Sequence, residues 1–445
     1  MGILVCVGFR DAARRMSQRS PLLPMFLIVL VDVLGFTIVI PLLAFYAEKF
    51  GASPLVATTL VSVYALCSLV ATPIIGRLSD QYGRKPLLMI SQTGTCLGFL
   101  MLAMSTSLWM VFVGRILDGI TAGNLSIAQA YISDHTKPEN RAKAFGVIGI
   151  AFGIGFMFGP ALGGILGSLG EHRECAPVFI DAGRSAAHHI VCVSSSDTLH
   201  LPFLVAAGLS AISITCTYLL LPKEPPPSTV QTDGPGGRRP SAFDWRTYAE
   251  YFGRPELRAI YVQFFLFSFA FSCFFSGFAL FAEHNEHLRW GADEVGWLFA
   301  YSGLLGIIMQ GGILGRLVKK YGELRLTVFA FIAAIASYTL VGFSTSTLML
   351  VGASTLSTFG HGLLRPVITS RLTQAVGRHE QGVVIGISGS LGSLAMAVAP
   401  PAGGLLLDSG HIVAWAMIPA GVSLLGLLFT VVWSGVKRVE LPSAP

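Results

Sequence analysis

Twelve long apolar stretches dominate the sequence and restrict what the chain can fold into. A helix needs about 20 mostly apolar residues to cross the hydrocarbon core of a bilayer. Stretches of this length occupy 24–47, 54–76, 86–106, 108–132, 143–168, 200–221, 257–282, 292–315, 325–344, 347–370, 383–407 and 411–436. The first stretch is too long for the apolar part of a cleaved signal peptide. The sequence therefore predicts an all-α membrane protein with twelve transmembrane helices.

The composition supports this prediction. Hydrophobic residues make up 53% of the chain and charged residues only 12%, whereas an ordinary soluble domain carries about a quarter charged residues. So few charges cannot cover the surface of a soluble globule of this length. A soluble enzyme and a disordered chain are therefore excluded.

The positive charges predict the orientation, because Lys and Arg collect on the cytoplasmic side of a membrane protein. With the N-terminus in the cytoplasm, the inside segments hold 24 of the 30 Lys and Arg residues and the outside segments hold 4. The other two, Arg115 and Arg365, lie within the predicted helices. We expect a multi-pass protein of the plasma (inner) membrane with both termini cytoplasmic. The net charge of +6 then needs no nucleic-acid partner.

Short motifs recur at nearly one spacing and indicate a duplicated unit. Gly76-Arg77-Leu78 returns as Gly315-Arg316-Leu317 after 239 residues, and Pro160 returns as Pro400 after 240. A segment rich in Pro, Gly and charge separates the two copies. The sequence predicts two pseudo-symmetric six-helix bundles, arranged as a tail (1–23), a first bundle (24–221, with an external loop 171–199), a cytoplasmic linker (222–256), a second bundle (257–436) and a tail (437–445).

A polar motif lies between the second and third stretches and consists of Gly76, Asp80, Gly83, Arg84 and Lys85. Gly83 predicts a tight turn that holds a carboxylate beside several cations at the membrane surface. Such a carboxylate can join two helices by an ion pair, and we interpret the motif as part of a gate. The alternative is a simple basic loop that stops translocation.

Small residues line the fifth stretch, where the motif comprises Gly146, Gly155, Gly159, Pro160, Gly163 and Gly164. Glycines four residues apart lie about 40° apart around a helix, so they form a smooth strip for close helix contact. The functional interpretation places this strip at the moving interface between the halves. The alternative is ordinary tight packing.

These two motifs resemble signatures of the major facilitator superfamily, in particular of the drug:proton antiporters that include the tetracycline exporters. Asp32-x2-Gly35-x4-Ile40-Pro41 resembles the first helix of that group, and Arg115-x2-Asp118-Gly119 resembles its fourth. The resemblance covers nearly all of 24–436. It implies a transporter that alternates access between two bundles and exchanges a drug for protons.

The chain also departs from that group. Ala44 stands where a second proline is usual, the stretch 325–344 contains no acid, and the loop 171–199 is unusually long. Cys175 and Cys192 in that loop could form a disulfide outside the cytoplasm, whereas the Cys and His spacing fits no standard metal site. The missing acid argues against tetracycline itself as the substrate.

Ionisable groups at membrane depth are costly and are therefore functional candidates. Asp32 lies about 12 Å deep at the helical rise, and we expect it to alternate between a protonated and a substrate-bound state. The alternative is a carboxylate held by a neighbouring amide or cation. Asp118 shares a helix face with Arg115, so this pair either takes part in proton transfer or neutralises itself.

Further polar residues within the stretches are candidates to line a substrate cavity: Asn124, Gln129, Gln263, Gln310 and Arg365. The amides could equally form hydrogen bonds between helices. Arg365 could bind an anionic group of a substrate or pair with Asp32. The eight phenylalanines of the seventh stretch suit an aromatic substrate, with lipid-facing filler as the alternative.

We find no phosphate-binding loop, catalytic triad or metal cluster in the sequence, so we expect no enzyme, no cofactor and no metal. The sequence predicts a monomeric secondary transporter that exports small amphipathic compounds and whose partners are a small-molecule substrate, protons and the lipid bilayer. Two alternatives stay open. One is an uncoupled facilitator or importer of a sugar or metabolite, and the other is a non-transporting membrane receptor or scaffold.

Overall fold

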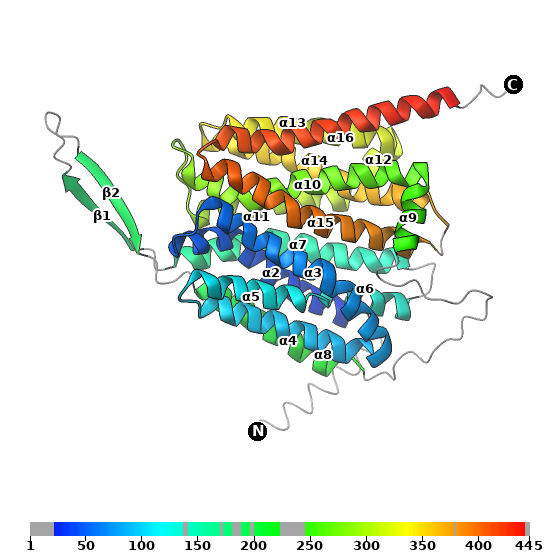
Figure 1. Cartoon of the computed structure of the whole chain (residues 1–445), viewed down its shortest axis with the longest axis horizontal. Coiled ribbons are helices and arrows are strands. Elements are labelled where there is room, and N and C mark those ends of the chain that lie inside the picture. The colour runs from blue at the N-terminus through cyan, green and yellow to red at the C-terminus, as the bar shows by residue number, and fades with distance from the viewer. Residues whose placement is uncertain are drawn as a thin grey trace.

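The computed structural model describes residues 22–136, 141–169, 172–179, 188–195, 200–222, 245–377 and 380–440. The N-terminal half contains α2 (Leu22–Lys49), α3 (Pro54–Tyr82), α4 (Arg84–Ala103), α5 (Leu108–Ile120), α6 (Asn124–His135), α7 (Arg141–Ser168) and α8 (Leu201–Leu220). The C-terminal half contains α10 (Pro255–His284), α11 (Ala292–Ile308), the π-helical segment η2 (Met309–Ile313), α12 (Leu314–Tyr321), α13 (Glu323–Gly342), α14 (Thr347–Gln374), α15 (Gln381–Asp408) and α16 (Ile412–Glu440). The helices form one elongated bundle (Figure 1).

The predicted all-α membrane architecture is confirmed. Eleven spans in the described part of the chain are long and apolar enough to cross a membrane. The remaining predicted stretch, 292–315, falls on α11, η2 and the start of α12, which follow one another without a gap. The π-helical turn interrupts the regular hydrogen bonding of this helix just before the repeated motif at Gly315. Such turns commonly mark functional positions.

Two elements lie in segments that we predicted as connections. The segment 171–199 contains the antiparallel strands β1 (His172–Phe179) and β2 (His188–Ser195), with Cys175 opposite Cys192 in the register. Figure 1 shows this hairpin projecting from one end of the helices. The last part of the predicted linker forms the helix α9 (Trp245–Gly253). The remaining linker residues, 223–244, and the tails up to residue 21 and from 441 lie outside the described residues.

The fourth stretch is broken into α5 and α6 by residues 121–123, and neighbouring side chains bind the freed backbone groups. The Ser91 hydroxyl donates to the Thr121 carbonyl and accepts from the Gly123 amide at 2.9 Å. The Thr72 hydroxyl donates to the Ala122 carbonyl at 2.7 Å. Within a membrane each of these groups would otherwise stay unsatisfied at a cost of several kcal/mol. The break therefore depends on hydroxyl groups from α3 and α4.

The glycine strip of α7 packs against α2 within its own half. A Cβ atom on Gly155 would lie 2.5 Å from Val33, one on Gly163 would lie 2.8 Å from the Ile38 carbonyl oxygen, and one on Gly159 would overlap Thr37. The Thr37 hydroxyl also donates to the Gly155 carbonyl at 2.9 Å. The prediction of close helix contact is confirmed, but its functional version is wrong for these three glycines, because they face α2 and not the other half.

The halves meet through the neighbouring glycine of each repeat. A Cβ atom on Gly164 would lie 2.7 Å from the Ala292 carbonyl oxygen of α11. Its repeat partner Gly404 is equally close to α3, where Leu55 Cα would lie 2.9 Å away. Gly163 and Gly403 instead face α2 and α10, the first helices of their own halves. In each repeat, the first of two adjacent glycines thus packs within its own half, and the second packs against the other half.

The glycines at the two ends of the bundle differ in the contacts they make. We call the ends the Gly51 end and the Gly83 end, after the turns between α2 and α3 and between α3 and α4. Gly164 and Gly404 make their contacts toward the Gly51 end. Toward the Gly83 end, Cβ atoms on Gly76 of α3 and Gly386 of α15 would meet nothing within 4 Å. Close glycine contact between the halves is therefore observed toward the Gly51 end.

Replacing Gly159 with Leu is expected to destabilise the protein by about 1–3 kcal/mol, the usual cost of forcing a larger side chain into a packed interface. The thermal unfolding midpoint of the detergent-solubilised protein measures the effect. Gly208→Leu is the matched control, because the same change in α8 meets nothing within 4 Å. Equal midpoints for the two variants would contradict the packing role of Gly159.

Candidate functional site

The loop motif forms a compact ion-pair network at the Gly83 end. Gly83 ends α3 with a φ of 96°, a conformation that favours glycine. This turn brings Arg84 back to Asp80, with Nη1 2.5 Å from Oδ1. The same guanidinium contacts Asp134 of α6 through Nε at 2.9 Å and donates to the Ser79 hydroxyl at 2.7 Å. One arginine therefore joins α3, α4 and α6, all in the N-terminal half.

Lys85 continues this network to the last helix of the half. Its ammonium group donates to the carbonyl oxygens of Tyr218 and Leu221 at 2.7 and 2.5 Å. The cation thus binds the C-terminal end of α8, where free carbonyls and the helix dipole favour positive charge. Together, Arg84 and Lys85 hold four helices of one half at this end. We interpret the motif as a carboxylate that joins two helices by an ion pair, and the helices it joins here all belong to the N-terminal half. Asp134 also belongs to this network, and sequence reasoning did not assign it.

The C-terminal half repeats the turn with different chemistry. Gly322 has a φ of 76° and lies between α12 and α13, where the repeated motif predicts it. The next residue, Glu323, accepts from the Ser370 hydroxyl at 2.6 Å and from the Gln374 amide at 3.0 Å. A carboxylate again joins two helices beside a glycine turn, but neutral donors replace the arginine.

Arg115 and Asp118 form a sealed ion pair in α5, as their spacing predicts. Nη1 lies 3.0 Å from Oδ2, and the two side chains are only 2% and 4% exposed. The Tyr64 ring covers the guanidinium at 4.4 Å, and Thr95 lies within hydrogen-bonding reach of the carboxylate. The pair neutralises itself within the membrane, so each charge already has its partner in this state.

Asp32 lies in a different environment. Its carboxyl group is within hydrogen-bonding reach of the Ser213 hydroxyl and the Gln92 amide, which bond each other at 2.7 Å. The second oxygen, Oδ1, has no hydrogen-bond partner among the described residues. No cation of the described chain forms an ion pair with this carboxyl group. Asp32 is therefore a carboxyl group inside the bundle whose charge no described side chain balances.

The candidate amides occupy contrasting positions. Gln263 is fully buried and accepts from Arg371 Nη1 at 2.8 Å, so in this state it forms a contact between helices and does not line a cavity. Asn124 begins α6, and its Oδ1 is buried without a hydrogen-bond partner among the described residues. Gln129 is partly buried, and Gln310 is exposed on the π-helical turn η2.

Arg365 lies about 13 Å from the end of α14 at Gln374, at the helical rise. Its side chain is exposed. No ion pair to its guanidinium, from Asp32 or another acid, occurs in the described part of the chain. A cation at this depth without an ion-pair partner is available to a negatively charged ligand. The predicted pair with Asp32 is absent from this state.

His361 is a partly buried polar residue that sequence reasoning missed. It lies one turn before Arg365 on the same face of α14. This spacing of four residues was the feature of the sequence that could have identified His361 as a candidate. Nε2 is 2.5 Å from the Tyr338 hydroxyl and Nδ1 is 2.9 Å from the Ser357 hydroxyl. Because hydroxyl groups both donate and accept, either protonation state of the imidazole has suitable partners.

The phenylalanines of α10 fill the interior. Four of the eight rings are buried and the other four are partly buried. The lipid-facing alternative therefore does not hold for the buried ones: Phe264, Phe267, Phe274 and Phe278. The rings of Phe271 and Phe275 stack at 5.4 Å, with His361 5.0 Å from the first and Phe156 of α7 6.0 Å from the second. An aromatic series thus leads from His361 in the C-terminal half to the N-terminal half.

A separate ion pair attaches α9 at the Gly83 end. Arg254 follows α9 and donates to both carboxylate oxygens of Glu380, at 2.8 and 3.2 Å, while Tyr251 donates at 3.1 Å. These hydrogen bonds, first from Arg254 and then from Tyr251, hold the pKa of the Glu380 carboxyl below its ordinary value. The pair joins the end of the linker to the start of α15.

Comparison with known proteins agrees with this architecture. The family model described as Major Facilitator Superfamily matches residues 25–338 and 277–444. The class C tetracycline resistance protein of Escherichia coli is 27% identical, over 86% of this chain and 89% of its own length. Multidrug resistance protein 2 of Bacillus subtilis (strain 168) is 25% identical, over 92% of this chain and 94% of its own length.

A solved structure shows the same fold. It is a bacterial homolog of the human lysosomal transporter Spinster, in an inward-facing and unoccupied conformation. The match covers 98% of this chain and 99% of that chain, with a TM-score of 0.72 and 14% sequence identity.

The attachment of α9 is expected to depend on the charge of Glu380. Because its pKa is lowered in the folded protein, the stabilisation is complete above the ordinary carboxyl pKa, declines as the pH falls from there, and is gone below the lowered pKa. Glu380→Gln should therefore increase hydrogen exchange of the α9 backbone at neutral pH. Glu250→Gln is the matched control, because Glu250 contacts Arg254 only within the same exposed turn. Equal exchange in both variants would show that the Glu380 pair does not hold α9.

Proposed function

The chain belongs to the major facilitator superfamily, and from that premise we propose that this transporter exports small amphipathic compounds in exchange for protons. It is an integral multi-pass membrane protein and not an enzyme. The proposal places it in the plasma membrane as a monomer with both termini in the cytoplasm, in line with the distribution of Lys and Arg. The names of the tetracycline and multidrug resistance relatives support the substrate class.

The observation that carries the proposal is the environment of Asp32. Asp118 has Arg115 at 3.0 Å, whereas Asp32 has only the neutral groups of Ser213 and Gln92. A buried carboxylate without a balancing cation is costly, so Asp32 gains most from binding either a proton or a cationic substrate group. Competition between these two ligands for one carboxyl group couples export to proton entry.

The contacts between the halves support alternating access. Gly164 and Gly404 hold the halves in close contact toward the Gly51 end, and alternating access requires these contacts to open and close in each cycle. The networks of Arg84 and Lys85 keep the helices of one half together while the halves rock. The loop motif thus keeps one half rigid, and the glycines between the halves allow the two halves to close against each other.

The C-terminal half would supply the substrate surface. Phe271 and Phe275 present stacked rings beside His361, and Arg365 adds an unpaired cation one turn away. Flat apolar compounds that carry a polar or anionic group match such a surface. The absence of an acid from the stretch 325–344 fits this interpretation, because the C-terminal half then binds with a cation where Asp32 in the other half offers an anion.

Asp32→Asn is expected to abolish the proton-dependent part of export while leaving the fold intact, because the amide cannot release a proton. Dye and drug accumulation in pump-deficient cells measures this, with and without a protonophore and at matched membrane expression. Wild-type protein should lower accumulation only without the protonophore, and Asp32→Asn should not lower it in either condition.

Asp408→Asn is the matched control, because this exposed carboxylate at the end of α15 should not affect coupling. Unchanged coupling in Asp32→Asn would overturn the proposed role of this residue. If wild-type protein moved no compound of a broad panel, the export proposal itself would fail, and uptake of sugars and metabolites would be the next assay.

Arg365→Gln is expected to raise the KM for anionic substrates about tenfold, because a hydrogen bond to a charged group contributes about 1.5–3 kcal/mol. Neutral substrates should be affected little. Initial rates over a concentration series separate the two classes, with Arg316→Gln on an exposed turn of α12 as the control. An equal effect on both substrate classes would indicate a structural role for Arg365.

A further inference from the structure

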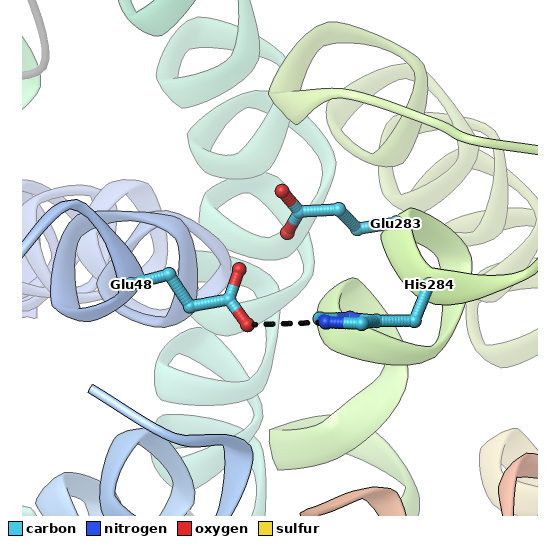
Figure 2. Close-up of side chains that lie close together, drawn as sticks. All are labelled: Glu48, Glu283 and His284. Carbon is cyan, nitrogen blue, oxygen red and sulfur yellow. Dashed lines mark ion pairs between the residues drawn. The ribbon is translucent and has the colours of Figure 1, made fainter. Parts of the chain in front are cut away.

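Three chelating side chains meet where the two halves touch at the Gly51 end. Glu48 is in the last turn of α2, and Glu283 and His284 are in the last turn of α10. Figure 2 shows Glu48 extending toward the other two across the boundary between the halves. One ligand atom from each residue lies within 4.8 Å of the others, and His284 Nε2 is 3.7 Å from a Glu48 oxygen.

The imidazole is oriented for metal binding. His284 Nδ1 is 2.9 Å from the Leu280 carbonyl oxygen. A carbonyl oxygen only accepts, so Nδ1 carries the hydrogen and the neutral ring has its lone pair on Nε2. That lone pair faces the Glu48 carboxylate. Metal-binding histidines commonly use this arrangement, in which a backbone carbonyl fixes the tautomer and leaves the other nitrogen for the ion.

The two carboxyl groups add a second requirement for positive charge. Glu48 and Glu283 lie within hydrogen-bonding reach of each other, although they come from different halves. Two carboxylates at this separation repel each other when both are ionised, and a proton or another cation between them removes that repulsion. The site therefore presents acceptor atoms from all three residues toward one region, and a cation is the ligand that satisfies them together.

We propose that Glu48, Glu283 and His284 bind a first-row transition-metal dication, for which Zn²⁺ is the best probe. One imidazole nitrogen and carboxylate oxygens are ordinary Zn²⁺ ligands, whereas Ca²⁺ and Mg²⁺ prefer oxygen alone. Tetrahedral ligands lie about 3.3 Å apart for metal–ligand distances of about 2.0 Å. Because the ligand atoms lie within 4.8 Å of one another, the flexible glutamates need to close by at most about 1.5 Å. His284 is 47% exposed, which leaves the fourth position open to water.

Such an ion would act on the transport cycle through its position. Its ligands come from α2 in one half and α10 in the other, so all three converge only when the Gly51 end is closed. A ligand that binds one state stabilises that state. Bound Zn²⁺ therefore holds the closed Gly51 end and slows the opening that each transport cycle requires. Binding displaces any proton shared by the two carboxyl groups.

Calorimetric titration of the purified full-length protein in detergent with Zn²⁺ tests the site without any transport assay. We expect one ion per chain, and an affinity at least tenfold weaker in both Glu48→Gln and His284→Asn. His287→Asn and Glu286→Gln are matched controls on the adjacent exposed turn and should bind as the wild type does. Thermal midpoints in the absence of metal show whether each variant is folded.

The segment 171–199 also contains histidines, so a variant with His188 and His189 both changed to Asn completes the set. If that variant lost binding while Glu48→Gln kept it, the ion would belong to the hairpin and the proposal would be wrong. No binding to the wild type, or equal affinity in wild type, Glu48→Gln and His284→Asn, would also overturn it. These outcomes are independent of whether the protein exports drugs.

A second readout tests the bridging role. Zn²⁺ should raise the thermal midpoint of the wild type but not of His284→Asn, and it should slow wild-type flux in proteoliposomes while leaving His284→Asn unaffected. Equal inhibition of both proteins would show that Zn²⁺ acts at another place and would overturn the bridging role.

Discussion

Close approach of helix backbones at glycine is the constraint on which this bundle depends. Inside a membrane, helices gain little from hydrophobic burial against one another, so contact requires small residues that let backbones come together. Gly155, Gly159 and Gly163 provide that contact between α7 and α2 within one half. The next residue, Gly164, provides close contact between the halves. The same helix therefore fixes the internal shape of one bundle and its boundary with the other.

The charged side chains also fall into two groups, those with an ion-pair or hydrogen-bond partner and those without an ion-pair partner. Arg84 and Lys85 are fully engaged within the N-terminal half, and Arg115 is sealed against Asp118 under the Tyr64 ring. Asp32 and Arg365 instead have no ion-pair partner among the described residues. Paired charges stabilise the structure of each half, whereas the unpaired ones are the groups that a proton or a substrate can address.

The two repeats share a backbone plan but differ in chemistry. Gly83 and Gly322 make equivalent turns, yet an arginine bridge follows the first and a glutamate bound by neutral donors follows the second. The N-terminal half holds Asp32, and the C-terminal half holds His361 and the stacked rings. The two halves thus share one frame but carry different polar groups on it.

The sequence by itself determined the twelve helices, the repeat and the glycine turns, because span length, hydropathy and glycine spacing are local properties of the chain. It also predicted the Arg115–Asp118 pair, which lies within one helix. Only the tertiary structure decided which neighbour each glycine of α7 faces, that Asp134 joins the Arg84 network, and that Gln263 is held by Arg371.

The group of Glu48, Glu283 and His284 illustrates the physical reason. Its members are separated by more than 200 residues and carry no common motif, so their meeting depends on how two helices from different halves are placed. A sequence pattern indicates the surroundings of one helix, because the period of its apolar residues and its length reflect which face is buried and how deep each residue lies in the membrane. Contacts between elements depend on packing angles and rotamers that no single segment encodes, and these decided which charges are paired and which remain available.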